Sequence, residues 1–214
     1  MRHQLTIIIC FFICLNVQAA QTPAVDKGSL SSQPTNIHAP IASVPPITFE
    51  TYLTPYDDAE VRFLQFLDLA KNRCYIASYS ITNPHIIEKL IQLHNRGVDV
   101  QVLTDKTQAA GKKEQIALAI LYENNVPVFV GRSVAHALMH CKFCVIDDHL
   151  VEDGSWNFTA SANKEDNILN FVDSKPRAKA FLAYWLKIRR DMVVQTPGAY
   201  LNTTGQSWQK EIVP

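Results

Sequence analysis

The residues best suited to chemistry lie in one stretch of the chain, HCKFCVIDDHLVEDGSWNFT, at positions 140–159. Within it, His140 and Lys142 are two residues apart, and a two-residue step along a β-strand places both side chains on the same face. Lysine offers a fixed positive charge, whereas histidine can attack an electrophile or exchange a proton. The pair could therefore act on a single atom of an anionic ligand.

Four polar or small residues follow the pair at defined distances: Asp147, Gly154, Ser155 and Asn157. Ser155 and Asn157 are again two residues apart, so both can face a ligand, and a glycine lets the backbone approach closely. Asp147 lies five residues after Lys142, so we expect it on the opposite face or in the turn, in a structural role such as pairing with a basic side chain.

A plain core hairpin is the simplest alternative for this stretch. It would account for the apolar residues, and we expect Trp156 and Phe158 to point into the core rather than to stack on bases. A hairpin does not explain Lys142 in the middle of an apolar strand, because lysine is almost never buried without a partner. Lys142 therefore requires an anion or an exposed site.

A metal site is a second alternative, since several potential ligands cluster here: His136, His140, Cys141, Cys144 and His149. On a strand, however, Cys141 and Cys144 are three residues apart and point to opposite faces. A neighbouring lysine ammonium disfavours a divalent cation, and the chain has no second Cys-x-x-Cys pair to complete a zinc ribbon. We predict no metal and no other cofactor.

The order His-x-Lys, Asp and Gly-Ser-x-Asn, with these spacings, resembles the HKD signature of the phospholipase D superfamily. The resemblance extends upstream through TPYDDAE, IASYSI and RGVDVQVLTD, and covers roughly residues 47–175. These segments look most like the small bacterial endonucleases of that superfamily, which carry a single copy of the motif.

The resemblance implies a two-step reaction, in which one histidine forms a phosphohistidine and a second acts as general acid and then base. His140 is the expected nucleophile, and Lys142, Ser155 and Asn157 are expected to hold the phosphate. The chain contains only one His-x-Lys, so the second histidine must come from another copy. We therefore predict a homodimer with one shared active site.

The family also places an acidic residue shortly after Gly-Ser-x-Asn, where it orients the nucleophilic histidine. Asp166 is the nearer match, because it directly precedes an asparagine, and Glu165 is the alternative.

The motif specifies the bond and leaves the substrate open. Nucleic acid is favoured by the compact single-motif form and by basic residues that could line the site, namely Lys106, Lys112, Lys113 and Arg132. A phospholipid is the alternative, although the sequence does not reveal the exposed apolar loop that membrane contact would need. A non-catalytic nucleic-acid-binding module is less favoured, because binding alone does not require a nucleophile.

The surrounding elements alternate between strand and helix, which predicts an α/β domain with a mixed sheet and helices on both faces. Strands are expected at residues 47–53, 74–81, 98–105, 127–131, 140–147, 150–155 and 167–174, and helices at 59–72, 84–97, 113–124 and 176–192. Residues 106–113 are expected to form a polar loop.

The two ends of the chain differ from this domain. Residues 1–19 have a short basic start, an apolar run of 13 residues from Leu5 to Val17 and a small-residue ending, which predicts a signal peptide cleaved after Ala19. A retained N-terminal anchor is the alternative. Residues 20–46 are rich in Pro and Ser and are expected to form a disordered linker. We expect the domain to span residues 47–192 and a C-terminal tail to span residues 193–214. The predicted signal peptide implies a periplasmic or secreted protein.

Composition sets two further limits. The formal net charge is zero, so an anionic ligand must be bound by a local patch rather than by a global field. Three cysteines remain after the predicted cleavage, and an odd number at these spacings does not describe a disulfide framework.

Overall fold

The computed structural model describes residues 48–190 and 192–194. These residues form an eight-stranded sheet with the strand order β1-β7-β6-β5-β2-β3-β4-β8. The predicted signal peptide, the whole predicted linker, the first residue of the predicted domain (47), and residues 191 and 195–214 lie outside the described part. No helix in the described part is long and apolar enough to cross a membrane.

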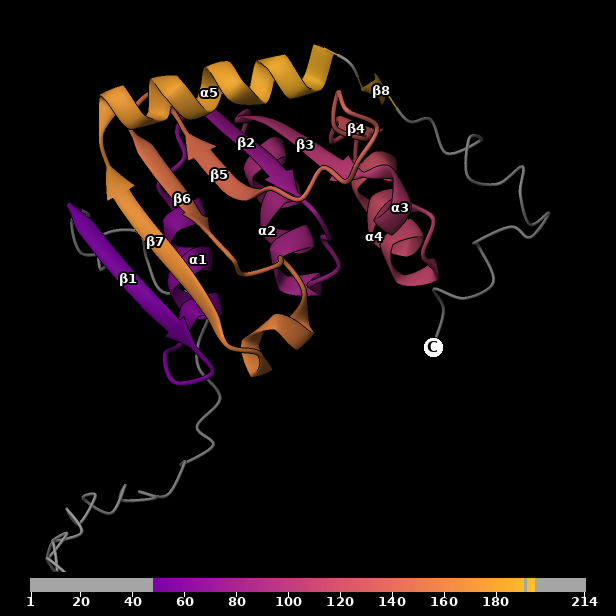
Figure 1. Ribbon diagram of the computed structural model, residues 1–214. Helices are drawn as coiled ribbons and strands as arrows, with labels where there is room; N and C mark the ends of the chain where they lie inside the picture. The colour runs from indigo at the N-terminus through magenta and orange to yellow at the C-terminus, as the bar shows by residue number, and fades with distance from the viewer. Residues whose placement is uncertain (1–47, 191, 195–214) are drawn as a thin grey trace, which may run out of the picture. The chain divides into compact units, whose positions relative to one another are not determined.

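The seven predicted strands and four predicted helices appear in the predicted order, and two short helices and one short strand that were not predicted are added to them (Figure 1). The strands are β1 (Phe49–Thr54), β2 (Arg73–Ser78), β3 (Asp99–Asp105), β4 (Val128–Gly131), β5 (Lys142–Ile146), β6 (Leu150–Gly154), β7 (Asn167–Asp173) and β8 (Val193–Val194). The helices are α1 (Ala59–Asp68), α2 (Pro84–Asn95), α3 (Lys106–Ala109), α4 (Lys112–Glu123), the 3-10 helix η2 (Ala160–Lys164) and α5 (Lys175–Arg190).

The sheet is mixed, as predicted. Strands β2, β3 and β4 are parallel, whereas β5 pairs antiparallel with β2, and β6, β7 and β1 continue the antiparallel half. The central pairing sets Ser78 of β2 opposite Lys142 of β5. The predicted active-site strand is therefore in the middle of the sheet, where pairing on both sides fixes its position.

Helices cover both faces of the sheet, and each face has its own apolar core (Figure 1). Helices α1, α2 and α4 cover one face and bury a large cluster that includes Phe63, Phe66, Trp156 and Phe158. Helix α5 crosses the other face, where Trp185 is fully buried and donates its indole N–H to the Ile76 carbonyl at 2.8 Å. Burial of Trp156 and Phe158 confirms their predicted core role.

Local sequence signals explain how α2 begins and ends. The Asn83 side chain accepts the backbone N–H of His85 at 2.9 Å, Pro84 occupies the first helical turn, and Gly97 adopts a φ of 89° just beyond the helix. The result is a helix whose N-terminus lies beside the carboxyl end of β2.

Several predicted boundaries are wrong. The expected polar loop 106–113 is mostly helical, because the Asp105 carboxylate accepts the N–H groups of Thr107 and Gln108 and so caps α3, and because α4 starts at Lys112. Strand β2 ends at Ser78 rather than at residue 81, and helix α1 ends at Asp68 rather than at residue 72. Two residues of the predicted tail, Val193 and Val194, pair with β4.

Candidate active site

The sheet topology brings the polar residues to one edge. Strands β2, β3 and β4 are parallel neighbours, so their carboxyl ends share an edge, and β5 begins at that edge because it runs antiparallel to β2. In open α/β sheets, ligands bind outside the carboxyl ends of the strands. The start of β5, with His140 and Lys142, therefore occupies the expected position for an active site.

His140 and Lys142 are in contact, although not in the way that the strand argument predicted. Strand β5 starts at Lys142, so His140 lies in the preceding loop and is exposed, whereas Lys142 is only 8% exposed. The Lys142 Nζ lies 3.3 Å from each ring nitrogen of His140 and donates a hydrogen bond to the His140 carbonyl at 3.0 Å. The structure thus joins a solvent-accessible imidazole to a largely buried cation.

The protonation of both groups is shifted by this arrangement. Partial burial lowers the pKa of His140, and the neighbouring Lys142 charge lowers it further, while Asp105 opposes the shift. Burial also lowers the pKa of Lys142. An imidazole with a lowered pKa is neutral at neutral pH, which is the form that a nucleophile requires.

Two residues beside this pair were not identified from the sequence. The Tyr79 ring lies 4.5 Å from the His140 ring and 4.8 Å from the Lys142 Nζ, measured to the ring centroid. Asp105, fully buried at the end of β3, accepts the Met139 N–H at 2.8 Å and so fixes the residue before His140. Tyr79 directly follows β2 and Asp105 is the last residue of β3. Because ligands bind at the carboxyl ends of parallel strands, these positions could have indicated from the sequence that both residues lie at the site.

Asn157 reaches the same edge through the segment that follows β2. The Tyr79 N–H donates to the Cys141 carbonyl at 2.7 Å on one side, and the Phe158 N–H donates to the Ser80 carbonyl at 3.2 Å on the other. The Asn157 Oδ1 is buried and has no hydrogen-bond partner within the described residues. This amide is therefore held near the start of β5 with an unused acceptor.

Ser155 is engaged with the neighbouring strand. Its hydroxyl donates to Asn167 Oδ1 at 3.1 Å and accepts the Ile168 N–H at 3.0 Å. The side chain is exposed. These contacts tie the Gly-Ser-x-Asn segment to β7, and the proposed phosphate contact of Ser155 stays a prediction.

Gly154 serves the packing of β6 against β7. A Cβ at this position would lie 1.9 Å from the Ile168 carbonyl oxygen, so no larger residue fits without moving a strand.

Asp147 lies at the far end of β5 from His140. Its carboxylate accepts the backbone N–H groups of Lys71, Asn72 and Arg73 at 3.2, 2.8 and 2.9 Å. The Arg73 guanidinium contacts the Asp147 backbone carbonyl rather than its carboxylate. The expected structural contact therefore exists, but the side chain anchors the backbone turn that enters β2 instead of pairing with a basic side chain.

Asp166 and Glu165 lie between η2 and β7, and both are exposed. Within residues 48–190, no hydrogen bond or ion pair joins either carboxylate to His140. The orienting role of Asp166 stays a prediction.

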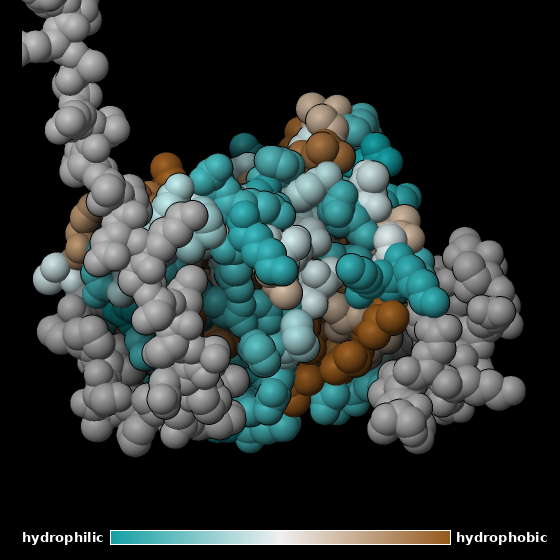
Figure 2. Space-filling view, turned by 90° about the horizontal axis from the view of Figure 1, so that it is seen from below, coloured by the Kyte–Doolittle hydropathy of each residue, from teal (hydrophilic) through white to brown (hydrophobic). Residues whose placement is uncertain are grey.

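The four predicted basic residues all lie at the active-site edge. Lys106 directly follows β3, Arg132 directly follows β4, and Lys112 and Lys113 open α4. All four are exposed. Among the described residues visible from below, most are hydrophilic, and hydrophobic residues form smaller patches between them (Figure 2).

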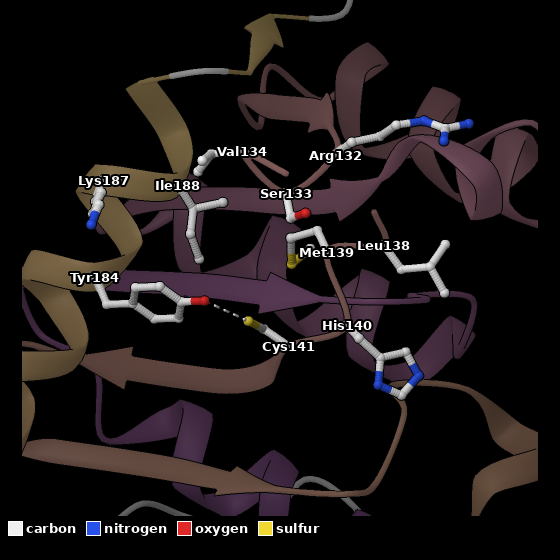
Figure 3. Close-up of a pocket in the computed structure, with 10 residues that line it drawn as sticks. All are labelled: Arg132, Ser133, Val134, Leu138, Met139, His140, Cys141, Tyr184, Lys187 and Ile188. Carbon is white, nitrogen blue, oxygen red and sulfur yellow. Dashed lines mark hydrogen bonds between the residues drawn. The ribbon is translucent and has the colours of Figure 1, made fainter. Parts of the chain in front are cut away.

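A small cavity of about 150 Å³ lies next to His140, between the loop 132–139, the start of β5 and helix α5 (Figure 3). Its lining residues are Arg132, Ser133, Val134, Leu138, Met139, His140, Cys141, Tyr184, Lys187 and Ile188. None of these lining residues, all from the described part of the chain, is acidic. The loop exposes 69% of Val134 and 44% of Leu138, so the site does have an exposed apolar loop, contrary to the expectation from the sequence.

The cysteines and histidines of this region do not converge. Cys144 is fully buried in the core below α1, α2 and α4, whereas Cys141 packs against the core below α5 and contacts Tyr184. Within residues 48–190 and 192–194, no group of three His, Cys, Asp or Glu side chains is placed to hold a metal ion.

Comparison with known proteins agrees with this geometry. A family model described as "Cardiolipin synthase, PLD-like domain" matches residues 63–188, which is more than half of the chain. The chain belongs to the phospholipase D superfamily. The matched range contains the whole His-x-Lys, Asp and Gly-Ser-x-Asn stretch, together with α2, β3 and most of α5.

Relatives in the superfamily include hydrolases of similar size. A protein named mitochondrial cardiolipin hydrolase from Chlamydomonas reinhardtii is 34% identical over 116 residues, which cover 54% of this chain and 50% of that protein. The match therefore covers only about half the length of that relative. A protein named phospholipase D from Rickettsia prowazekii is 28% identical over 160 residues, which cover 73% of this chain and 75% of that protein.

Solved structures of the superfamily share the fold. Nuc from Salmonella typhimurium, described as a phospholipase D family member, superposes with a TM-score of 0.65 at 26% identity and covers 69% of this chain and 97% of that chain. NucT from Helicobacter pylori has a TM-score of 0.63 at 22% identity, with 69% and 99% covered, and so supports the fold alone. The relatives that match this chain are thus named as hydrolases or described as members of the phospholipase D family.

Proposed function

We propose that this protein is a phosphodiesterase that cleaves nucleic acid without a metal ion, through a phosphohistidine formed on His140. The observation that carries the proposal is the contact between His140, accessible and with a lowered pKa, and the buried Lys142 cation. Four exposed basic residues at the same edge of the sheet offer further contacts for a polyanion.

The first step places the imidazole nitrogen of His140 on phosphorus. The P–N bond forms while the bond to the leaving alcohol breaks, and the leaving oxygen takes a proton from the partner subunit's His140, which must enter this step as the imidazolium while the nucleophile is neutral. In the second step that imidazole removes a proton from water, the water oxygen attacks phosphorus, and the P–N bond breaks to regenerate His140. Lys142 and Asn157 hold the phosphate oxygens throughout.

The homodimer is part of this proposal, because one chain supplies a nucleophile but no second histidine beside it in the described residues. The proposal also includes export. The apolar run from Leu5 to Val17 supports a cleaved signal peptide and a periplasmic or secreted protein. Sequencing the N-terminus of the chain recovered from a cell fractionation tests this, since a mature start at Ala20 is expected.

A second candidate function, phospholipid cleavage, is supported by the exposed Val134 and Leu138 in the loop that leads to His140. Apolar residues beside a basic site are suited to contact with an anionic membrane. Several relatives from Rickettsia are named phospholipase D, which supports the same candidate.

The experiment compares plasmid DNA, RNA and phosphatidylcholine vesicles, each incubated with the purified mature chain in EDTA. Cleavage of DNA or RNA supports the first candidate, and release of choline alone supports the second. His140→Ala must abolish whichever reaction is found, and acid-labile phosphate bound to the parent chain after rapid quenching would identify the phosphohistidine. Binding of DNA without cleavage of any substrate would contradict both candidates and favour a non-catalytic module.

A further inference from the structure

The buried cation of the active site has no carboxylate partner. Lys142 is 8% exposed, and none of the ion pairs formed by the described residues includes it. A buried ammonium without an anion is costly, and burial accordingly lowers its pKa. The groups around the ammonium therefore determine how far its pKa falls.

Four groups face the Lys142 ammonium. Its own segment supplies the His140 carbonyl at 3.0 Å, the two His140 ring nitrogens at 3.3 Å and the neighbouring Cys141 thiol. The segment after β2 supplies the Tyr79 ring, whose centroid lies 4.8 Å from Nζ. A cation within about 6 Å of an aromatic ring face is attracted by the ring quadrupole, and the attraction grows when water is excluded.

The Tyr79 ring is fixed from two directions. Its backbone N–H donates to the Cys141 carbonyl at 2.7 Å, which places the residue beside the start of β5. Its hydroxyl accepts the Gln108 side-chain N–H at 2.7 Å, and Gln108 belongs to α3, which Asp105 caps.

Asp105 connects helix α3 to the segment that carries His140. The same carboxylate that caps α3 also accepts the Met139 N–H at 2.8 Å, one residue before His140. The Tyr79 backbone N–H at Cys141 and the Asp105 carboxylate at Met139 therefore hold the two ends of the short segment that carries His140, and the Tyr79 ring packs against that imidazole.

We propose that Tyr79 is a positioning residue of this active site, which keeps Lys142 protonated with its ring face and holds the His140 imidazole beside it. The Tyr79 hydroxyl contributes only by orienting the ring through Gln108. The inference rests on the proposed function for its catalytic consequence, but the effect on Lys142 is independent of any substrate.

The test follows the Lys142 pKa directly, by NMR of the chain labelled with ¹³C at the lysine Cε positions, with the signal assigned from a Lys142→Met spectrum. Tyr79→Leu removes the ring, and we expect the pKa of Lys142 to fall by about one unit, as loss of a desolvated cation–π contact implies. Tyr79→Phe keeps the ring and should leave the pKa close to that of the parent. Tyr122→Leu, on α4, is the matched control for the substitution itself.

The catalytic consequence is a shift of the alkaline limb of the kcat/KM profile. Protonated Lys142 binds the phosphate, so activity is lost as the pH rises through its pKa, and Tyr79→Leu should move that loss to lower pH. Measuring all variants in a Cys141→Ala background removes the adjacent thiol as a second group titrating in this range. Tyr79→Phe should retain the profile of the parent.

Two results would overturn the inference. One is an unchanged Lys142 pKa in folded Tyr79→Leu, and the other is an equal loss of activity in Tyr79→Phe and Tyr79→Leu, which would assign the role to the hydroxyl. If Tyr79→Leu does not fold, Tyr79→Met, which also lacks the ring but has a longer side chain, still decides, since it should lower the Lys142 pKa while Tyr79→Phe keeps it. Full activity of His140→Ala would refute the proposed function and leave the Lys142 result standing.

Discussion

Replacing Asp147 by glycine should destabilise the protein without impairing the chemistry of the molecules that remain folded. The Asp147 carboxylate accepts three backbone N–H groups at the turn into β2, at 2.8 to 3.2 Å. Hydrogen bonds to a charged group contribute about 1.5–3 kcal/mol each, but three bonds to one partly exposed carboxylate are not additive, so we expect a loss of about 3 kcal/mol. For a domain of this size that corresponds to a fall in Tm of roughly 6 to 12 °C.

Glycine is the informative substitution because Asp147 has a φ of 52°. Alanine would add the strain of a left-handed backbone to the lost hydrogen bonds, whereas glycine adopts this conformation freely. Asp147→Asn is the matched control. Its Oδ1 can still accept the N–H groups of Asn72 and Arg73, so it should lose roughly half as much stability.

Urea unfolding followed by tryptophan fluorescence measures these differences, since Trp156 and Trp185 are fully buried. Turnover per folded molecule, measured well below the Tm, should stay close to that of the parent. A free energy of unfolding within about 0.5 kcal/mol of the parent would refute the structural role, given the accuracy expected of such comparisons. A large loss of turnover in a fully folded variant would instead place Asp147 in the chemistry.

Three further outcomes follow from the site. Cleavage should persist in EDTA, and loss of activity that a divalent ion restores would contradict the metal-free mechanism. The pKa of His140, followed by NMR of its ring, should lie below 6.5 and should rise in Lys142→Met, which removes a charge that lowers it; a higher pKa in the parent would reverse the argument. Gly154→Ala should cost about 2 kcal/mol or more in urea unfolding, because its Cβ would meet the Ile168 carbonyl at 1.9 Å, whereas Gly111→Ala, with a nearest atom at 3.1 Å, should cost less.

Much of the fold could be predicted from the sequence because its signals are local. Alternation and apolar runs located the seven main strands, and Asn83, Pro84 and Gly97 marked the ends of α2. The spacing of the motif residues from His140 to Asn157 identified the superfamily, because residue types and spacings can be read without knowledge of the fold. The mixed sheet with helices on both faces followed from the order of these elements.

The features that were missed depend on contacts between distant segments. Tyr79 looked like part of an apolar strand, and only the pairing of β2 with β5 places its ring against His140 and Lys142. The exposure of Val134 and Leu138 likewise depends on how the loop before His140 packs against α5. Periodicity reports which side of an element is apolar but not which loops meet at its end.

The central claim is that one active site is built from two chains. Mixing parent chains with an excess of His140→Asn chains, after subunit exchange, gives heterodimers that hold a single histidine of the pair. A heterodimer with one histidine cannot complete both steps of the reaction, so only dimers of two parent chains turn over. Activity should therefore fall roughly as the square of the parent fraction. A linear fall, or a fully active monomer in sedimentation at the assay concentration, would mean that each chain carries a complete site and would contradict the account.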